Sequence, residues 1–126
     1  KNLTICTTVN DIPICANCFY SYMEAGNFLL FKSNRKTQHI TNALINHNVA
    51  GTILPDITKT GRIKGVQFSG KFIIPTDDLL AKAQKIYYTK HPFALPMLGE
   101  LWMISLVFVK MTDNTMGFGK KIIWQK

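Results

Sequence analysis

The sequence is short of acidic residues, of cysteine and of long apolar runs. Only 7 aspartates and glutamates stand against 15 lysines and arginines. The longest nearly uncharged stretch, residues 93–109, contains Glu100 and Pro96, and it is shorter than the roughly 20 apolar residues of a transmembrane helix. Three cysteines, an odd number, and the lack of an apolar segment behind a basic start argue against a disulfide-stapled secreted fold. They predict a reducing, cytoplasmic setting.

The scarcity of acidic residues leaves a net charge of +8. Such a surface favours an anionic partner, and charge alone fits a nucleic acid, a membrane surface or a small phosphorylated molecule equally well. The basic residues are scattered, and only Arg35-Lys36 and Lys120-Lys121 are adjacent. The lack of a basic block disfavours a nucleic-acid-binding tail.

Length and composition are those of one globular domain. A chain of 126 residues with 47% hydrophobic and 17% charged residues can bury one core and differs from disordered proteins. We therefore expect a single domain over residues 1–126. A strand-like run begins at Leu3 and no initiator methionine precedes it, so we expect that an upstream helix is missing.

Short β-like runs dominate the pattern. Asn10-Asp11 predicts a turn between the first two strands, and Gly65 and Gly70 suggest bulges or bends in a long later strand. The strands expected from residue type and alternation are residues 3–9, 14–22, 28–31, 49–54, 62–74, 101–110 and 121–124.

Two segments have helical spacing instead. In residues 35–47 apolar positions recur every three or four residues, with Ser33 or Asn34 placed to cap the start. Residues 79–88 predict a second helix, with Asp77-Asp78 in its first turn. Strands joined by short turns pair antiparallel. The expected fold class is therefore mainly β, an antiparallel barrel of six to seven strands with two or three marginal helices.

A polar corner follows the third expected strand. Ser33, Arg35 and Lys36 supply a hydroxyl and two cations beside a helix N-terminus, where backbone N–H groups and the helix dipole favour an anion. These residues predict a phosphate site. A plain helix cap with two solvated cations is the alternative that the local sequence leaves open.

Gln67 is a second candidate, on the long strand that contains both glycines. It shares a face with Gly65 and Ser69, and the missing side chain of Gly65 would admit a flat ligand. An amide donates and accepts together, as a ring with mixed imide and carbonyl edges requires. An ordinary outward polar residue is the alternative.

The cysteines and histidines give weaker signals. Cys15 and Cys18 are three apart on a strand, so their side chains point to opposite faces and form neither a metal site nor a redox pair. We expect both to be small buried hydrophobic residues. His39, His47 and His91 have no visible aspartate or serine partner, so surface or capping roles are expected and no metal site is predicted.

Several motifs together resemble a known family. Residues 31–37, 46–50 and 64–70 are similar to the pyridoxamine 5′-phosphate oxidase-like, FMN-binding split-barrel superfamily. Residues 15–20 and 112–124 are similar, more narrowly, to the YhbP-like bacterial family UPF0306. The resemblance implies a split β-barrel, a homodimer and FMN in a groove between subunits.

The resemblance also assigns roles to residues. It implies that Ser33, Arg35 and Lys36 bind the flavin phosphate and that Gln67 meets the isoalloxazine edge. Oxidase members carry an arginine-rich strand that leads to the flavin, whereas residues 16–19 contain no arginine here. The resemblance thus favours flavin binding over pyridoxamine phosphate oxidation.

Two functions of different classes follow from the sequence. The first is an FMN-binding split-barrel protein, with flavin-dependent oxidoreductase activity on an unknown small molecule. It would be a homodimer whose interface includes parts of residues 15–22 and of the C-terminal segment. The alternative is a non-enzymatic small barrel that binds nucleic acid or another anionic ligand through its basic surface.

Overall fold

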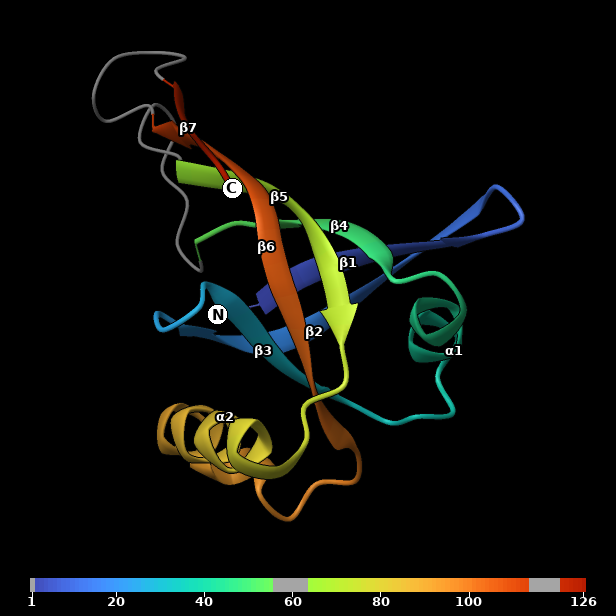
Figure 1. Ribbon diagram of the computed structural model, residues 1–126, viewed down its shortest axis with the longest axis vertical. Helices are drawn as coiled ribbons and strands as arrows, with labels where there is room; N and C mark the ends of the chain where they lie inside the picture. Colours follow the sequence, from blue (N-terminus) through green and yellow to red (C-terminus); the bar gives the residue numbers. More distant parts are fainter. Residues whose placement is uncertain (1, 56–63, 114–120) are drawn as a thin grey trace.

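The computed structural model describes residues 2–55, 64–113 and 121–126, and its main element is a seven-stranded antiparallel sheet (Figure 1). The strand order is β3-β2-β1-β4-β5-β6-β7, and an additional pairing of β3 with β6 closes all strands but β7 into a barrel. The expected mainly-β barrel is therefore confirmed. The strands are β1 (Asn2–Val9), β2 (Ile12–Met23), β3 (Phe28–Ser33), β4 (Asn48–Ile53), β5 (Lys64–Ile73), β6 (Glu100–Asp113) and β7 (Lys121–Gln125).

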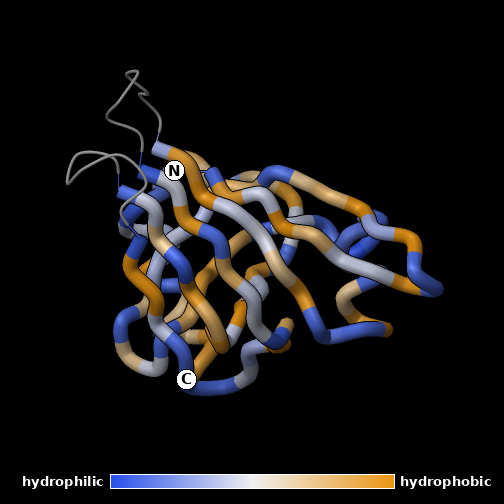
Figure 2. Tube along the Cα trace, turned by 90° about the horizontal axis from the view of Figure 1, so that it is seen from above, coloured by the Kyte–Doolittle hydropathy of each residue, from blue (hydrophilic) through white to orange (hydrophobic). Residues whose placement is uncertain are grey.

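β1 and β2 form a hairpin around the predicted turn. Asn10 and Asp11 have positive φ angles of 53° and 62°, the conformation of a two-residue turn that matches the strand twist. The turn pairs Val9 with Ile12 and so sets the register of the whole hairpin. Buried and more exposed positions alternate along β1, and Figure 2 shows the matching alternation of hydrophobic and hydrophilic positions along the strands.

The longest strand, β6, connects the two sides of the barrel. It pairs with β3 near its start, with β5 along most of its length and with β7 near its end. The β5–β6 register shifts between Ser69 and Gly70, and a Cβ atom at Gly70 would collide with the Ser105 carbonyl oxygen. The bulge expected at Gly70 is confirmed, whereas pairing at Gly65 is regular.

Two helices lie at the margins of the barrel (Figure 1). α1 (Gln38–Ile45) packs on β1, and α2 (Asp77–Lys90) packs mainly on β2 before a short 3₁₀ turn, η1 (Pro92–Ala94). Asp77 and Asp78 lie in the first turn of α2, as expected. Among the described residues, no helix combines the length and apolarity needed to cross a membrane.

The expected start of the first helix is wrong. α1 begins at Gln38 with Thr37 as its N-cap residue, and no side chain caps it. The Asn34 side-chain oxygen instead accepts the Lys36 N–H at 2.9 Å, and the Asn34 carbonyl accepts the Thr37 N–H at 3.0 Å. This local turn competes with helix formation, so Asn34 caps a turn and Ser33 ends β3.

Large buried aromatic side chains gather around Trp102, at the end of the barrel where β3 leads to α1. Trp102, Phe31 and Phe72 are almost fully buried, and the Phe72 ring lies 5.3 Å from the Trp102 ring and 6.3 Å from the Phe31 ring. Ile40 of α1 joins the same cluster. These residues define what we term the aromatic end of the barrel.

Candidate functional site

The predicted polar corner lies where β3 ends and the chain turns toward α1. The term corner is used below for residues 33–36. Lys36 is exposed, and no ion pair of the described residues includes it. Its backbone N–H is fixed by the Asn34 side chain. The corner thus presents an uncompensated ammonium group on an ordered turn.

Arg35 is held by two contacts. Its guanidinium donates to both carboxylate oxygens of Glu100, at 3.1 and 3.3 Å, and it lies over the Trp102 ring at 5.1 Å from the centroid. Barrel closure brings Glu100 here, because β6 pairs it with Ser33. The two side chains are 51% and 53% exposed, so the pair contributes at most about 1 kcal/mol. The carboxylate offsets part of the Arg35 charge.

Ser33 contacts a histidine and a cysteine. Its Oγ lies 2.6 Å from His39 Nε2, and Cys18 Sγ lies 3.8 Å from Ser33 Oγ and 3.9 Å from His39 Nε2. Burial lowers the pKa of His39 and raises the pKa of the Cys18 thiol. Both groups therefore favour their neutral forms, and neutral His39 can accept the Ser33 proton. The expectation that no histidine has a serine partner is wrong for His39, because the turn brings the two together without strand or helix periodicity.

The backbone of the corner is anchored to the aromatic end. The Trp102 indole N–H donates to the Ser33 carbonyl at 2.8 Å. Gly99, with φ of +128°, lies against the corner, and a Cβ atom there would be 3.1 Å from the Ser33 carbonyl carbon and 3.2 Å from the Asn34 nitrogen. Only glycine accommodates both this conformation and this approach readily. These contacts fix the position of the corner backbone.

A small hollow of about 160 Å³ opens beside Ser33. Phe19, Met97 and Leu98 contribute exposed apolar surface to it. Lys32 also lines it, with its Nζ donating to the Ala94 carbonyl at 2.8 Å. Apolar surface next to cationic groups suits a ligand with both a ring and an anionic group.

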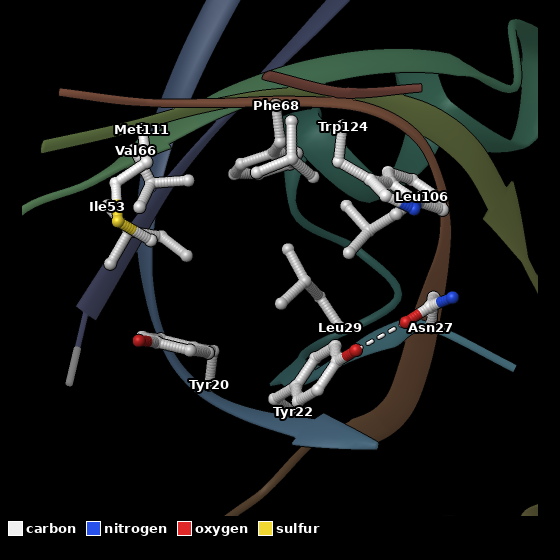
Figure 3. Close-up of a pocket in the computed structure, with 11 residues that line it drawn as sticks. Tyr20, Tyr22, Asn27, Leu29, Ile53, Val66, Phe68, Leu106, Met111 and Trp124 are labelled. Atoms are coloured by element: carbon white, nitrogen blue, oxygen red, sulfur yellow. Dashed lines mark hydrogen bonds between the residues drawn. The ribbon is translucent and has the colours of Figure 1, made fainter. Parts of the chain in front are cut away.

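A larger cavity of about 390 Å³ lies at the other end of the barrel, here termed the cavity end. Figure 3 shows Leu29, Phe68, Leu106 and Trp124 pointing into it from different strands. At its rim the Tyr22 hydroxyl donates to the Asn27 side-chain oxygen (Figure 3). Its volume lies in the range of about 300–1,000 Å³ that is typical of small-molecule sites. No local pattern in the sequence indicates this cavity.

Gln67 lies far from the corner. It is exposed on β5 and pairs with Lys110 of β6, whereas Ser33 pairs with Glu100 of the same strand. At about 3.3 Å per residue, Glu100 and Lys110 are roughly 30 Å apart along β6. One chain therefore brings Ser33, Arg35 and Lys36 together but not Gln67.

The cysteines differ from one another in burial. Cys18 is buried, as expected, whereas the same expectation is wrong for Cys15, which is exposed. The two side chains do diverge, because Cys15 contacts Cys6 while Cys18 contacts Ser33. In the described part of the chain, no three His, Cys, Asp or Glu side chains converge as a metal site would require.

Of the other two histidines, His91 lies at the end of α2 and His47 lies on the surface. His91 is the C-cap residue of α2, and its Nε2 lies 2.7 Å from the Tyr20 carbonyl oxygen, in a buried position. His47 is exposed. The expected capping and surface roles are therefore confirmed for these two residues.

Comparison with known proteins identifies relatives along almost the whole chain. A UPF0306 protein of Photorhabdus laumondii is 38% identical over 124 residues, covering 98% of this chain and 87% of the relative. A UPF0306 protein of Yersinia enterocolitica is 36% identical, covering 98% and 84%. No family model matches the sequence.

Solved structures with the same fold are distant in sequence. A heme-binding protein of Mycobacterium smegmatis superposes with a TM-score of 0.81 at 16% identity, over 98% of this chain; this chain spans about half (52%) of that one. A pyridoxamine 5′-phosphate oxidase-related, FMN-binding protein of Nostoc punctiforme gives 0.69 at 11% identity, covering 99% and 80%. An FAD-binding protein of M. smegmatis gives 0.69 at 19% identity, covering 87% and 83%. The chain has the split-barrel fold of these proteins and belongs to the UPF0306 family.

Proposed function

We propose that this chain is a flavin-binding protein that holds the phosphate of FMN at the corner. The observation that carries the proposal is the exposed Lys36 ammonium on an ordered turn, beside Arg35 and the Ser33 hydroxyl. A phosphate dianion binds strongly to such charge-assisted donors. The FMN- and FAD-binding neighbours of the same fold support the choice of a flavin.

The two cations have different roles in this proposal. Lys36 supplies the open charge, whereas Arg35 shares its charge with Glu100. A phosphate therefore competes with Glu100 for the guanidinium. Replacing Glu100 by Gln removes the competing charge, and FMN should bind the E100Q variant more tightly than the wild type.

In this proposal, the residue that meets the flavin ring comes from a second copy of the chain. Gln67 is too far along β6 from the corner to reach the same flavin within one chain. We therefore place Gln67 from a partner subunit at the isoalloxazine edge of a symmetric dimer. Exposed apolar residues that would be covered include Phe19 on β2 and Ile123 on β7. Sedimentation at micromolar concentration should give a dimer, and a monomer would contradict this arrangement.

A bound flavin would supply electron or hydride transfer, so we propose an oxidoreductase of unknown small-molecule substrate. Three free cysteines support a reducing compartment such as the cytoplasm. The small hollow beside Ser33 offers apolar surface near the corner for the substrate or the ring.

The phosphate proposal is tested by titrating FMN and riboflavin into the wild type and the Lys36→Ala variant. Loss of one charge-assisted hydrogen bond costs about 1.5–3 kcal/mol, so the FMN dissociation constant should rise about 10- to 150-fold. Riboflavin lacks the phosphate and should bind both proteins equally. Flavin fluorescence gives both constants.

A matched control separates the local effect from net charge. Lys82 is an exposed lysine on α2, and Lys82→Ala removes the same charge away from the corner. FMN should bind this variant as it binds the wild type. Equal loss in both lysine variants would indicate a general electrostatic effect, and no loss in Lys36→Ala would place the phosphate elsewhere.

A further inference from the structure

Cys6 and Cys15 face each other across the β1–β2 hairpin. The register pairs them directly, and their sulfur atoms lie 3.0 Å apart. Both are free thiols. A pair of thiols in direct contact on neighbouring strands is chemically different from either cysteine alone.

The backbone geometry of this pair suits a disulfide. Opposite residues in an antiparallel ladder alternate between hydrogen-bonded and non-hydrogen-bonded pairs. Pro13 has no N–H, so its pair with Thr8 is a non-hydrogen-bonded one, and the Cys6–Cys15 pair two positions along is of the same kind. The Cα atoms of such pairs are about 4.5 Å apart, within the range of about 4.4–6.8 Å that disulfides span.

The two thiols differ in access. Cys15 is exposed and Cys6 is partly buried. Burial first, and then the contact with Cys15, raises the pKa of Cys6 to about 11. A dissolved oxidant therefore reaches the Cys15 sulfur first. The Cys6 thiol is less accessible and keeps its proton near neutral pH. The third cysteine, Cys18, is buried elsewhere and contacts Ser33.

We propose that Cys6 and Cys15 form a reversible redox site that small disulfides such as oxidised glutathione convert to an intramolecular disulfide. The Cys15 thiolate attacks one sulfur of the oxidant, which releases one glutathione thiol and leaves a mixed disulfide on Cys15. Cys6 loses its proton to solvent and displaces the second glutathione. The two cysteines lose two electrons and two protons, and the oxidant gains them as two thiols.

The Cys6–Cys15 pair is separate from the corner and lies next to the part of β1 on which α1 packs. Thr7 follows Cys6 on β1, and its hydroxyl accepts a hydrogen bond from the Asn42 side chain of α1 at 3.4 Å. Asn46 at the end of α1 donates to the Thr8 carbonyl at 3.1 Å. The disulfide would tie β1 to β2 at the position where α1 rests. The proposed dimer surface lies further along β2, at Phe19, and leaves Cys15 accessible.

The experiment incubates the folded full chain with oxidised glutathione and then counts thiols in denaturant. Free thiols should fall from three to one, and the protein should become about 2 Da lighter through the loss of two hydrogens. Dithiothreitol should restore all three thiols. Retention of three thiols, or disulfides only between chains, would overturn the proposal.

Variants identify the cysteines involved. Cys18→Ser should still lose two thiols, because the pair remains. Cys6→Ser should stop at the mixed disulfide with glutathione on Cys15. If Cys6→Ser instead lost both remaining thiols to an intramolecular disulfide, Cys15 would be pairing with Cys18 and the assignment to Cys6 would be wrong. The circular dichroism spectrum of each variant is recorded before oxidation, because only a folded variant holds the cysteines in the described positions.

Discussion

The two ends of the barrel are built differently although the same strands form both. At the aromatic end, Trp102, Phe31 and Phe72 fill the interior. At the cavity end, about 390 Å³ lies between Phe68 and Trp124, and Trp124 is 39% exposed. The corner is bonded to the filled end. The barrel therefore holds its cationic corner against the filled end and has its free volume at the opposite end.

The difference between the two ends arises from the way the strands pair. β3 and β6 pair from Ser33–Glu100, at the aromatic end, as far as Phe28–Ser105. Beyond Ser105, β6 leaves β3 and pairs with β7 instead. The barrel wall is thereby opened, and fewer side chains converge on the interior.

The largest expected difference between the ends is in stability. Trp102→Ala removes a fully buried side chain and leaves the Ser33 carbonyl without its indole donor. It should lower the free energy of unfolding by about 3–5 kcal/mol. Trp124→Ala, at the cavity end, should cost less than about 1.5 kcal/mol because that side chain is partly exposed. Denaturant unfolding measures both, and equal losses would contradict the comparison.

Filling the interior should have opposite effects at the two ends. Ala43 is a fully buried residue of α1, so the larger side chain of Ala43→Leu should cost about 1–3 kcal/mol. Val66 lines the cavity, and Val66→Phe should raise the free energy of unfolding by about 0.5–2 kcal/mol. Thermal unfolding of the two variants shows whether each substitution raises or lowers the free energy of unfolding. A loss of stability in Val66→Phe would mean that the cavity end is already well packed.

A smaller effect is expected on the pH dependence of stability. Burial lowers the pKa of His39 below its ordinary value of 6.5, so the unfolded chain takes up a proton first as the pH falls. The contribution of His39 is therefore fully present above about pH 6.5 and is lost as the pH falls toward its folded pKa.

A histidine variant isolates this contribution. His39→Gln should flatten the decline of unfolding free energy below pH 6.5. Urea unfolding between pH 5 and pH 7.5 measures the slopes. Identical slopes in wild type and His39→Gln would show that His39 is not titrating as described.

The sequence predicted the features that depend on neighbouring residues. The Asn10-Asp11 turn sets the hairpin register, and this register places Cys6 opposite Cys15. Gly70 predicted its bulge because a side chain collides there. Local propensity and sterics determine these features.

Contacts between distant segments could not be predicted in the same way. Arg35 meets Glu100 only because β3 and β6 close the barrel, and no periodicity in either segment indicates that pairing. His39 reaches Ser33 because Asn34 makes a turn instead of a helix cap. The cavity end depends on where β6 parts from β3, which follows from the whole sheet.

The most direct measurement is the diffraction of crystals of the protein grown with FMN. The proposal predicts phosphate density at the corner, with an oxygen about 2.7–2.9 Å from Lys36 Nζ, and Gln67 of a partner subunit at the ring. Density for the whole flavin inside the cavity end, with nothing bound near Lys36, would contradict it.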